Sequence, residues 1–299
     1  MKLSWLFKGD SLIGVDIGLH SVKITQLKLK RGYPEIIGLA SVTADINEMD
    51  TEALAVALAE VFSQINYQGQ PVTATLNGEQ LITRIVMVPQ MSDSELQTNM
   101  FYEAAELLPN ETADWVIRHT VLNNQADKQG LMQVLLIAAP RQQVLLFYQA
   151  FKMAGIKLTV IDIPYYALWR LYGNLPINPN DSVLIINLEV DHAQLVVVRQ
   201  NIIQHVRSIR FSKENLINEL ERYLAIYQVQ QSNYPIKQII LTGEISGMSD
   251  IAQVVNQGLN IKVEIGRPNL PMGEQANNKN IDLASYSIAI GSALRGVGH

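Results

Sequence analysis

The sequence predicts an α/β fold with two similar lobes and an α+β subdomain inserted between the parts of the first lobe. An apolar run, a glycine-containing turn and a second apolar run fill residues 12–24, and a similar arrangement recurs at residues 183–198. Residues 76–157 mix strand-like and helix-like segments, as a separate unit would. A duplicated fold with a cleft between its halves explains this organisation.

The composition is that of a globular chain. Of its 299 residues, 48% are hydrophobic and 17% are charged, which argues against disorder. The net charge is −5 and no long basic stripe occurs, so we expect no nucleic-acid partner. There is no cysteine, and the five histidines lack metal-site spacing, so we expect no disulfide and no histidine or thiolate metal site. No run of about 18 apolar residues exists, so we expect a soluble chain without a membrane span.

In the first half, hydrophobic spacing predicts a strand meander followed by a helix and a strand. The meander covers residues 12–17, 22–29 and 35–43, the helix residues 51–65, and the strand residues 72–76. After the insertion, a strand is expected at residues 157–161, and Pro164 is expected to begin a helix that runs to residue 172.

In the inserted unit, Ser92 and Glu95 form the sequence pattern of a helix capping box. The helix that follows is expected to close near Pro109. A second helix is expected to begin after Pro140 and to be capped by Gly155. Strands are expected at residues 81–88, 116–122 and 132–139.

Turn-forming residues at 174–181 mark the main boundary of the chain. Beyond it, the pattern predicts three strands, a helix, a strand, a helix, a strand and a terminal helix. The expected ranges are residues 183–188, 193–198 and 202–209, then 213–228, 237–242, the residues after 247, 261–265 and 283–296.

The two halves align at a constant offset. In this alignment, Asp16 corresponds to Asn187, Gly18 to Glu189, and Lys23 to Gln194. In the first hairpin, the pattern D-x-G-x-x-S-x-K supplies the groups that hold a phosphate. Glycine lets backbone N–H groups approach the phosphate, the Ser21 hydroxyl can bind it, and Asp16 can hold the waters of a bound Mg²⁺.

These motifs resemble the actin/Hsp70/FtsA superfamily and, within it, the PilM family of type IV pilus assembly proteins. The segment "IGVDIGLHSVKITQL" is similar to the family's first phosphate loop. "VPQMSDSELQTNMFYEAAELLP" and "LLIAAPRQQVLLFYQAFKMAGIKLTVIDIPYYALWRL" resemble its two most specific stretches. "IILTGEISGMSDIAQVVNQGLNIKVEIGRP" resembles the adenosine loop with its flanks, and "SYSIAIGSALRG" resembles the C-terminal helix. The matches run over residues 12–296.

The resemblance implies an actin-like fold of the duplicated, ribonuclease H-like type. Residues 1–75 and 158–178 would form the first lobe, residues 76–157 the FtsA/PilM-like subdomain, and residues 179–299 the second lobe. It also implies ATP with Mg²⁺ between the lobes, the Mg²⁺ near Asp16. The candidate nucleotide-binding residues are Asp16, Gly18, Leu19, His20, Ser21, Lys23, Asn187, Gly243 and Glu244.

The resemblance further implies a cytoplasmic adaptor at the inner-membrane assembly platform of the pilus. Such a protein binds the short cytoplasmic N-terminal tail of the membrane protein PilN in a groove beside the inserted subdomain. The chain would therefore be peripheral to the inner membrane through its partner, and self-association is a second expected contact.

The chain departs from the family pattern at two of its three loops. Asn187 and Glu189 stand where an aspartate and a glycine are expected, and Glu244 replaces a glycine of the adenosine loop. A carboxylate and a phosphate about 4 Å apart repel by roughly 1 to 4 kcal/mol. The insertion at residues 211–236 has room for one helix, which resembles the short MshI-like branch.

We therefore expect a protein that is not an enzyme, and the residues leave nucleotide binding open. The alternative functions are an active ATPase or sugar kinase of the same superfamily, or an FtsA-like filament former. Three residues keep two interpretations each. His20 is either a ligand contact or an exposed turn residue. Lys23 meets a phosphate or faces solvent, and Asp162 lies in the hinge between the lobes or caps the next helix.

Overall fold

The computed structural model describes residues 11–18, 20–44, 50–78, 80–123, 130–175, 178–212, 214–231, 233–244, 248–274, 276 and 281–297. One candidate nucleotide-binding residue of the sequence analysis, Leu19 of the first hairpin, lies outside these ranges.

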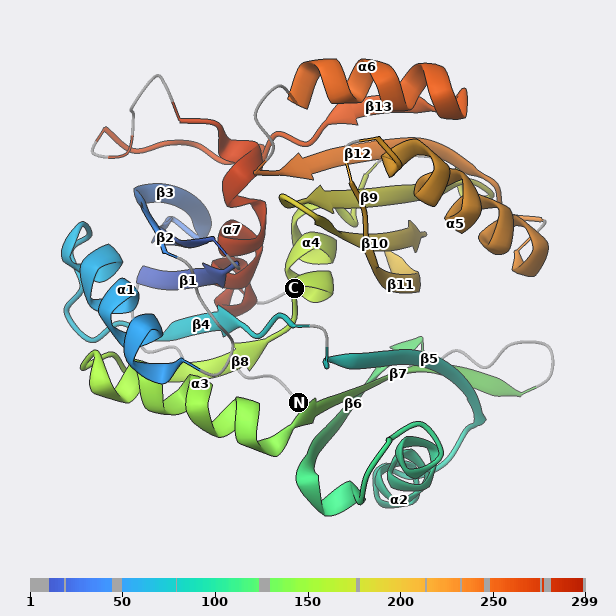
Figure 1. Cartoon of the computed structure of the whole chain (residues 1–299), viewed down its shortest axis with the longest axis horizontal. Helices are drawn as coiled ribbons and strands as arrows, with labels where there is room; N and C mark the ends of the chain where they lie inside the picture. Colours follow the sequence, from blue (N-terminus) through green and yellow to red (C-terminus); the bar gives the residue numbers. More distant parts are fainter. Residues whose placement is uncertain are drawn as a thin grey trace.

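Two five-stranded sheets with the same strand order confirm the duplicated α/β fold (Figure 1). The first sheet has the order β3-β2-β1-β4-β8 and the second has the order β11-β10-β9-β12-β13. In both, the first strand pairs antiparallel with the second and parallel with the fourth. We call the two sheets with their packed elements the first and the second lobe.

The strands of the first sheet are β1 (Ser11–Ile17), β2 (Ser21–Lys30), β3 (Tyr33–Thr43), β4 (Val72–Thr75) and β8 (Leu158–Asp162). Those of the second are β9 (Ser182–Leu188), β10 (His192–Arg199), β11 (Ile202–Arg210), β12 (Ile236–Gly243) and β13 (Lys262–Ile265). The central strands are buried along nearly their whole length, because both faces of each sheet are covered.

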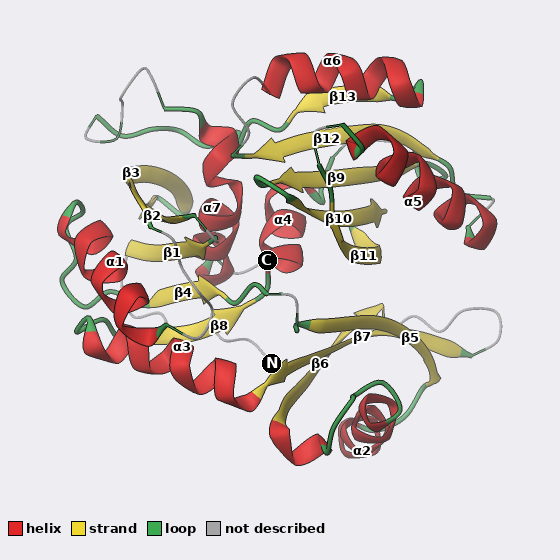
Figure 2. Ribbon diagram, viewed as in Figure 1, coloured by secondary structure: helices red, strands yellow, loops and turns green. Residues whose placement is uncertain are grey.

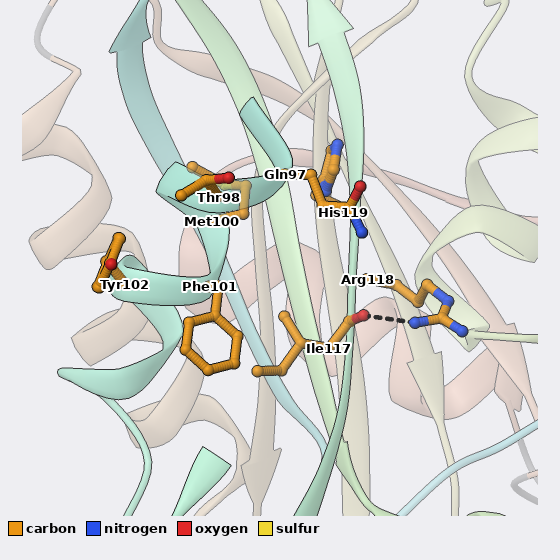
Figure 3. A pocket seen from close by; sticks show the side chains of 8 residues that line it. All are labelled: Gln97, Thr98, Met100, Phe101, Tyr102, Ile117, Arg118 and His119. Carbon is orange, nitrogen blue, oxygen red and sulfur yellow. Dashed lines mark hydrogen bonds between the residues drawn. The ribbon is translucent and has the colours of Figure 1, made fainter. Parts of the chain in front are cut away.

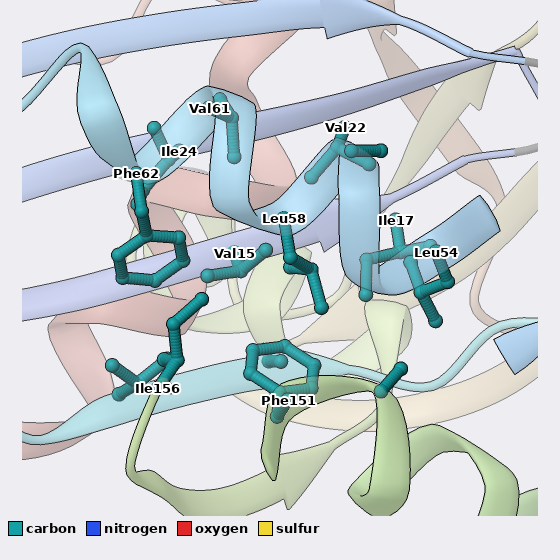
Figure 4. Close-up of a cluster of buried hydrophobic side chains, with 14 of the residues drawn as sticks. Val15, Ile17, Val22, Ile24, Leu54, Leu58, Val61, Phe62, Phe151 and Ile156 are labelled. Atoms are coloured by element: carbon teal, nitrogen blue, oxygen red, sulfur yellow. The ribbon is translucent and has the colours of Figure 1, made fainter. Parts of the chain in front are cut away.

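Helices α1 (Thr51–Ser63) and α3 (Arg141–Met153) cover the outer face of the first sheet (Figures 1 and 2). Their apolar residues recur at helical spacing, so one stripe of each helix faces the strands. Figure 4 shows Leu58 and Val61 of α1 together with Val15 of β1 and Phe151 of α3 in this core. Helices α5 (Leu216–Gln230) and α6 (Met248–Leu259) cover the second sheet in the same way.

Two helices between the sheets join the lobes (Figure 1). Helix α4 (Pro164–Tyr172) follows the first sheet in sequence but packs its residues Tyr165 and Leu168 on the second sheet. Helix α7 (Ser287–Ala293) follows the second sheet and packs Ile290 on the first. Each lobe therefore contributes a helix to the other lobe's core.

Close backbone packing holds these two helices in place. A Cβ atom on Gly14 of β1 would lie 1.9 Å from the backbone oxygen of Ala289 in α7. A Cβ atom on Gly291 of α7 would lie 2.0 Å from the backbone oxygen of Ala167 in α4. Only glycine fits at both positions, so sheet, α7 and α4 form one tightly packed unit at the centre of the molecule.

The inserted subdomain is a three-stranded sheet, order β5-β7-β6, with α2 (Asp93–Ala105) on one face (Figure 2). Its strands are β5 (Ile82–Pro89), β6 (Trp115–Asn123) and β7 (Leu131–Pro140), and a 3₁₀ turn, η2 (Thr112–Asp114), precedes β6. The predicted capping box is confirmed: the Ser92 hydroxyl accepts from the N–H of Glu95, and the Glu95 carboxylate accepts from the N–H of Ser92.

The C-terminal segment differs from the single helix expected at residues 283–296. It consists of the 3₁₀ turn η3 (Leu283–Tyr286), then α7, then the 3₁₀ turn η4 (Leu294–Gly296). Asp282 caps η3 by accepting from the N–H of Ala284. Within the described ranges, no helix combines the length and the apolar character that a bilayer-spanning helix needs.

Candidate functional site

The candidate site lies where the first hairpin, the second hairpin and the end of β12 meet between the lobes. We call the charged and polar side chains gathered there the interlobe cluster. It consists of Asp16, Ser21, Lys23, Thr75 and Asn77 from the first lobe, and of Asn187, Glu189, Gln194 and Glu244 from the second.

The first hairpin presents Ser21 and Lys23 on the same face of β2, because side chains two residues apart in a strand share a face. The turn is closed by the N–H of Gly18, which donates to the carbonyl oxygen of Ser21 over 2.9 Å. Both side chains are buried, with relative exposures of 5% for Ser21 and 6% for Lys23. Of the two interpretations of Lys23, the one in which it faces solvent is therefore wrong.

A carboxylate of the second lobe binds both of these side chains. The Oε2 atom of Glu244 accepts a hydrogen bond of 2.9 Å from the Ser21 hydroxyl. The same oxygen lies 2.7 Å from the Lys23 ammonium. Ser21 and Lys23, which were predicted to bind a phosphate, thus bind the carboxylate of Glu244. The sequence had placed Glu244 only in the adenosine loop.

The backbone around Gly243 fixes the position of Glu244. Gly243 has φ +114°, and a Cβ atom there would lie 2.0 Å from the backbone oxygen of Leu188, so the position requires glycine. The N–H of Glu244 then donates to that same Leu188 oxygen over 2.9 Å. The end of β12 is therefore attached to the end of β9, and the Glu244 side chain reaches across to the first lobe.

The second hairpin repeats the backbone of the first. The N–H of Glu189 donates to the carbonyl of His192 over 2.8 Å, at the position of the Gly18–Ser21 bond. Its side chains bind one another: Asn187 Nδ2 donates to Gln194 Oε1 over 2.7 Å, and Gln194 Nε2 donates to Glu189 Oε1 over 3.0 Å. The side chains of the second hairpin, at the positions that would bind a ligand in an intact second phosphate loop, are therefore hydrogen-bonded to one another.

Glu189 also reaches the first lobe. Its Oε1 atom accepts a hydrogen bond of 3.4 Å from the amide of Asn77, which follows β4. Its Oε2 atom lies 3.6 Å from the place where a Cβ atom on Gly18 would be, directly above the first hairpin. Two glutamates of the second lobe, Glu189 and Glu244, therefore contact the first lobe.

Asp16 is buried at the centre of the cluster, opposite Lys23 in the β1–β2 register. Burial raises the pKa of its carboxyl from 3.8 to about 7, which Lys23 opposes and the charges of Glu189 and Glu244 reinforce. The pKa of Glu189 is also raised, chiefly by burial and against the hydrogen bond from Gln194. The cluster thus holds three carboxyl groups near one ammonium group.

These side chains, as they lie, do not fit the triphosphate of a Mg²⁺-bound nucleotide. The hydroxyl and the ammonium that would bind phosphate are bonded to Glu244, and Glu189 lies over the glycine turn. Among the described residues, no group of three or more acidic, histidine or cysteine side chains has the geometry of a metal site. A nucleotide would have to displace at least one glutamate before its phosphates could reach the first hairpin.

Of the predicted site residues, the structure brings together Asp16, Gly18, Ser21, Lys23, Asn187, Gly243 and Glu244. Leu19 lies outside the described residues, and the ligand role of the whole set stays a prediction. His20 is exposed in the turn, as one of its two interpretations expected, and its carbonyl oxygen accepts from the N–H of Ala44.

Sequence reasoning named Gln194 only as the counterpart of Lys23, and it missed Thr75 and Asn77. Asp16 pairs with Thr75 in the β1–β4 register, and Asn187 pairs with Thr242 at the matching place in the second lobe. The repeat could have found them, because residues that end the fourth strand of each sheet must lie beside the hairpin residues.

Asp162 lies in the contact between the lobes, and its alternative role as a helix cap is wrong. The N-cap residue of α4 is Ile163, which has no side-chain cap bond. The buried Asp162 carboxylate instead pairs with Arg170 of α4 and, over 2.9 Å, with Arg295 of η4. Arg170 also donates to the carbonyl of Gly291 in α7. Asp162 therefore joins the end of β8 to both central helices.

A groove crosses the inserted subdomain between α2 and the edge strand β6 (Figure 3). Its volume is about 600 Å³, and Figure 3 shows Phe101 of α2 facing Ile117 of β6. Among the described strands, β6 pairs with β7 alone. The Arg118 guanidinium donates to the Ile117 carbonyl over 2.8 Å along this edge. The lining residues are Gln97, Thr98, Met100, Phe101, Tyr102, Ile117, Arg118 and His119.

A second hollow of about 560 Å³ continues along α2 and shares Thr98 and Tyr102 with the first. Phe101 and Tyr102 are 47% and 66% exposed, although both are large aromatic side chains. An apolar helix face beside an unpaired strand edge is the kind of surface that receives an extended peptide.

The repeated sheets and the exchanged central helices give this protein the actin-like fold. The sequence profile of the type IV pilus assembly protein PilM matches residues 14–214, about two thirds of the chain. The chain belongs to this family.

Solved structures show the same fold. A PilM–PilN type IV pilus biogenesis complex contains a chain with a TM-score of 0.85 and 20% identity, over 96% of this chain and 98% of that one. The cytoplasmic domain of EpsL, an inner-membrane component of the type II secretion system of Vibrio cholerae, has a TM-score of 0.55 and 11% identity over 95% of both chains. A Bacteroides thetaiotaomicron protein with an actin-like ATPase fold has a TM-score of 0.50 and 10% identity over 97% of this chain and 98% of that one.

Proposed function

We propose that this protein is an adaptor of a type IV pilus or related secretion machine, and that it binds the cytoplasmic N-terminal tail of a PilN-like inner-membrane protein. Membership of the PilM family and the similarity to the chain in a PilM–PilN complex support the partner. The adaptor is cytoplasmic and reaches the inner membrane through that partner.

The observation that carries the proposal is the groove of the inserted subdomain. Met100, Phe101 and Ile117 give it an apolar floor, and the Arg118 guanidinium lies beside it on the Ile117 carbonyl. Such a surface accepts a short segment whose apolar side chains enter the hollows while its backbone runs along β6. To pair with β6, the segment would replace the Arg118 side chain on the Ile117 carbonyl.

The interlobe cluster supports an adaptor more than an ATPase or a sugar kinase. Phosphoryl transfer needs a carboxylate that orients the nucleophile and donors free to stabilise the transferring phosphate. Here Asn187 binds Gln194, and both Ser21 and Lys23 bind Glu244. We therefore propose a protein without phosphoryl-transfer activity, in which ATP with Mg²⁺ acts at most as a structural or regulatory ligand.

A binding experiment tests the proposed partner and its place. A synthetic peptide with the N-terminal residues of the PilN-like protein from the same pilus operon is titrated into the full-length chain by calorimetry. We expect saturable binding. We also expect Phe101→Ser to weaken it at least tenfold, because the exposed ring is lost from the floor of the groove without opening the core.

Tyr33→Ser is the matched control, since Tyr33 is an exposed aromatic residue at 76% on the β2–β3 turn, away from the inserted subdomain. It should change the affinity less than twofold. Equal affinities of Phe101→Ser and Tyr33→Ser would exclude the groove, and the absence of binding to the unaltered chain would exclude the partner.

A further inference from the structure

We propose that Glu244 is a built-in substitute for a nucleotide phosphate: its carboxylate occupies the phosphate-binding groups of the first hairpin and holds the lobes together without a ligand. This inference concerns the contact between the lobes and stands independently of the partner proposed above.

The Glu244 carboxylate lies where a phosphate bound at the first hairpin would lie. A phosphate bound at the first hairpin would accept hydrogen bonds from the Ser21 hydroxyl and the Lys23 ammonium. The Oε2 atom of Glu244 accepts both, at 2.9 and 2.7 Å. A carboxylate oxygen and a phosphate oxygen have the same charge sign and the same preference for these donors. They therefore compete for one position.

Gly243 and the hydrogen bond from the Glu244 N–H to Leu188 fix the backbone of Glu244 on the second lobe. Its partners belong to β2 of the first lobe, more than 220 residues earlier in the sequence. The ion pair is thus a contact between lobes, in the place where a nucleotide would otherwise join them.

The Lys23 side chain is 8% exposed, and its ammonium group lies near the carboxyl groups of Asp16, Glu189 and Glu244. Removing Glu244 leaves a buried cation short of a partner, whereas adding a phosphate beside Glu244 brings two anions together. The arrangement satisfies one anion at a time, so nucleotide binding requires Glu244 to leave.

The test removes the charge and keeps the shape. Binding of ATP with Mg²⁺ is measured by calorimetry for the unaltered chain, for Glu244→Gln and for the control Glu221→Gln, which removes the same charge from an exposed position on α5. We expect Glu244→Gln to bind at least tenfold more tightly than the unaltered chain and than Glu221→Gln. The double variant Lys23→Met, Glu244→Gln should lose this gain in nucleotide affinity, because it lacks the Lys23 ammonium that would bind the phosphate.

The second readout needs no nucleotide. The chain has no cysteine, so Val56→Cys on α1 and Val254→Cys on α6 provide two unique spin-label sites, one on each lobe, at exposed positions. With Glu244 present, we expect one narrow distance distribution between the labels. With Glu244→Gln, we expect a broader distribution that ATP with Mg²⁺ narrows again.

Equal nucleotide affinities for Glu244→Gln and Glu221→Gln would overturn the claim that Glu244 occupies the phosphate position. An unchanged distance distribution would overturn the claim that it holds the lobes together. Neither result depends on a peptide partner, so failure here is distinct from failure of the proposed adaptor function.

Discussion

The Nζ atom of Lys23 and the Oε2 atom of Glu244 lie 2.7 Å apart, one on each lobe of a duplicated fold. The contact joins the hairpin that the sequence predicts to bind phosphate with a residue that departs from the family pattern. It is a direct side-chain contact between the lobes, in addition to the backbone packing of α4 and α7 that joins them.

The packing of the central helices gives a first prediction. Glycine in a helix interior usually costs about 1 kcal/mol relative to alanine, so Gly291→Ala would normally stabilise α7. Here the added Cβ would lie 2.0 Å from the Ala167 oxygen, which is backbone and cannot move aside. We expect the substitution to lower the free energy of unfolding by about 3 kcal/mol, the upper end of the usual cost of overpacking, measured by urea denaturation.

Gly18→Ala is the control for this effect of an added methyl group. A Cβ atom there would meet its nearest atom, the Ser21 oxygen, at 3.5 Å, an ordinary contact. Its unfolding midpoint should match that of the unaltered chain. A Gly291→Ala protein as stable as Gly18→Ala would contradict the close approach of α7 and α4.

A second prediction concerns Asp162. Asp162→Ala would leave Arg170, whose side chain is 6% exposed, without its carboxylate, and Arg295 without its partner. Breaking a buried pair in this way costs about 3–5 kcal/mol. Thermal unfolding should show a large fall in midpoint, whereas Lys30→Ala, which removes an exposed ion pair with Glu35, should cost less than about 1 kcal/mol. Similar midpoints for the two variants would show that Asp162 does not join the lobes.

A third prediction is a pH dependence of stability in buffer with a metal chelator. The folded-state pKa of Asp16, about 7, lies above its unfolded value of 3.8, so the folded chain binds this proton more tightly. The protonated Asp16 carboxyl therefore adds to the stability of the fold. This contribution is complete below about pH 4 and is lost as the pH rises to about 7. Asp16→Asn keeps the shape and removes the titration. Between pH 5 and pH 8, the free energy of unfolding of Asp16→Asn should therefore rise by about 1–3 kcal/mol relative to that of the unaltered chain.

The raised pKa of Glu189 acts in the same direction and remains in both proteins. Because the charge of Glu189 also raises the pKa of Asp16, the comparison reports on Asp16 together with its coupling to Glu189. Parallel stability profiles for the two proteins across this range would contradict a folded-state pKa of Asp16 that is raised above its unfolded value.

Much of the fold followed from the sequence, because periodic apolar residues and the internal repeat carry it. The alignment of Asp16 with Asn187 and of Lys23 with Gln194 matches the strand registers, in which Asp16 faces Lys23 and Asn187 faces Gln194. The capping box at Ser92 is a local motif and needs no tertiary information. These features depend on residues close together in the chain.

The contacts between the lobes could not be predicted from the sequence in the same way. The bond from Lys23 to Glu244 depends on how two sheets lie relative to each other, which α4 and α7 decide through backbone packing at Gly14 and Gly291. The same limit applies to Asp162, whose two arginine partners come from different helices. Periodicity reports which face of a strand is buried, but it does not report the partner across an interface.

The most direct test of the adaptor account is a calorimetric titration of the PilN-like tail peptide into nucleotide-free protein, repeated with ATP and Mg²⁺. Because Glu244 already joins the lobes, the account predicts saturable binding without nucleotide and an affinity that changes less than threefold when nucleotide is added. No binding under either condition would contradict the adaptor function, and binding only with ATP and Mg²⁺ would contradict the claim that Glu244 joins the lobes without a ligand.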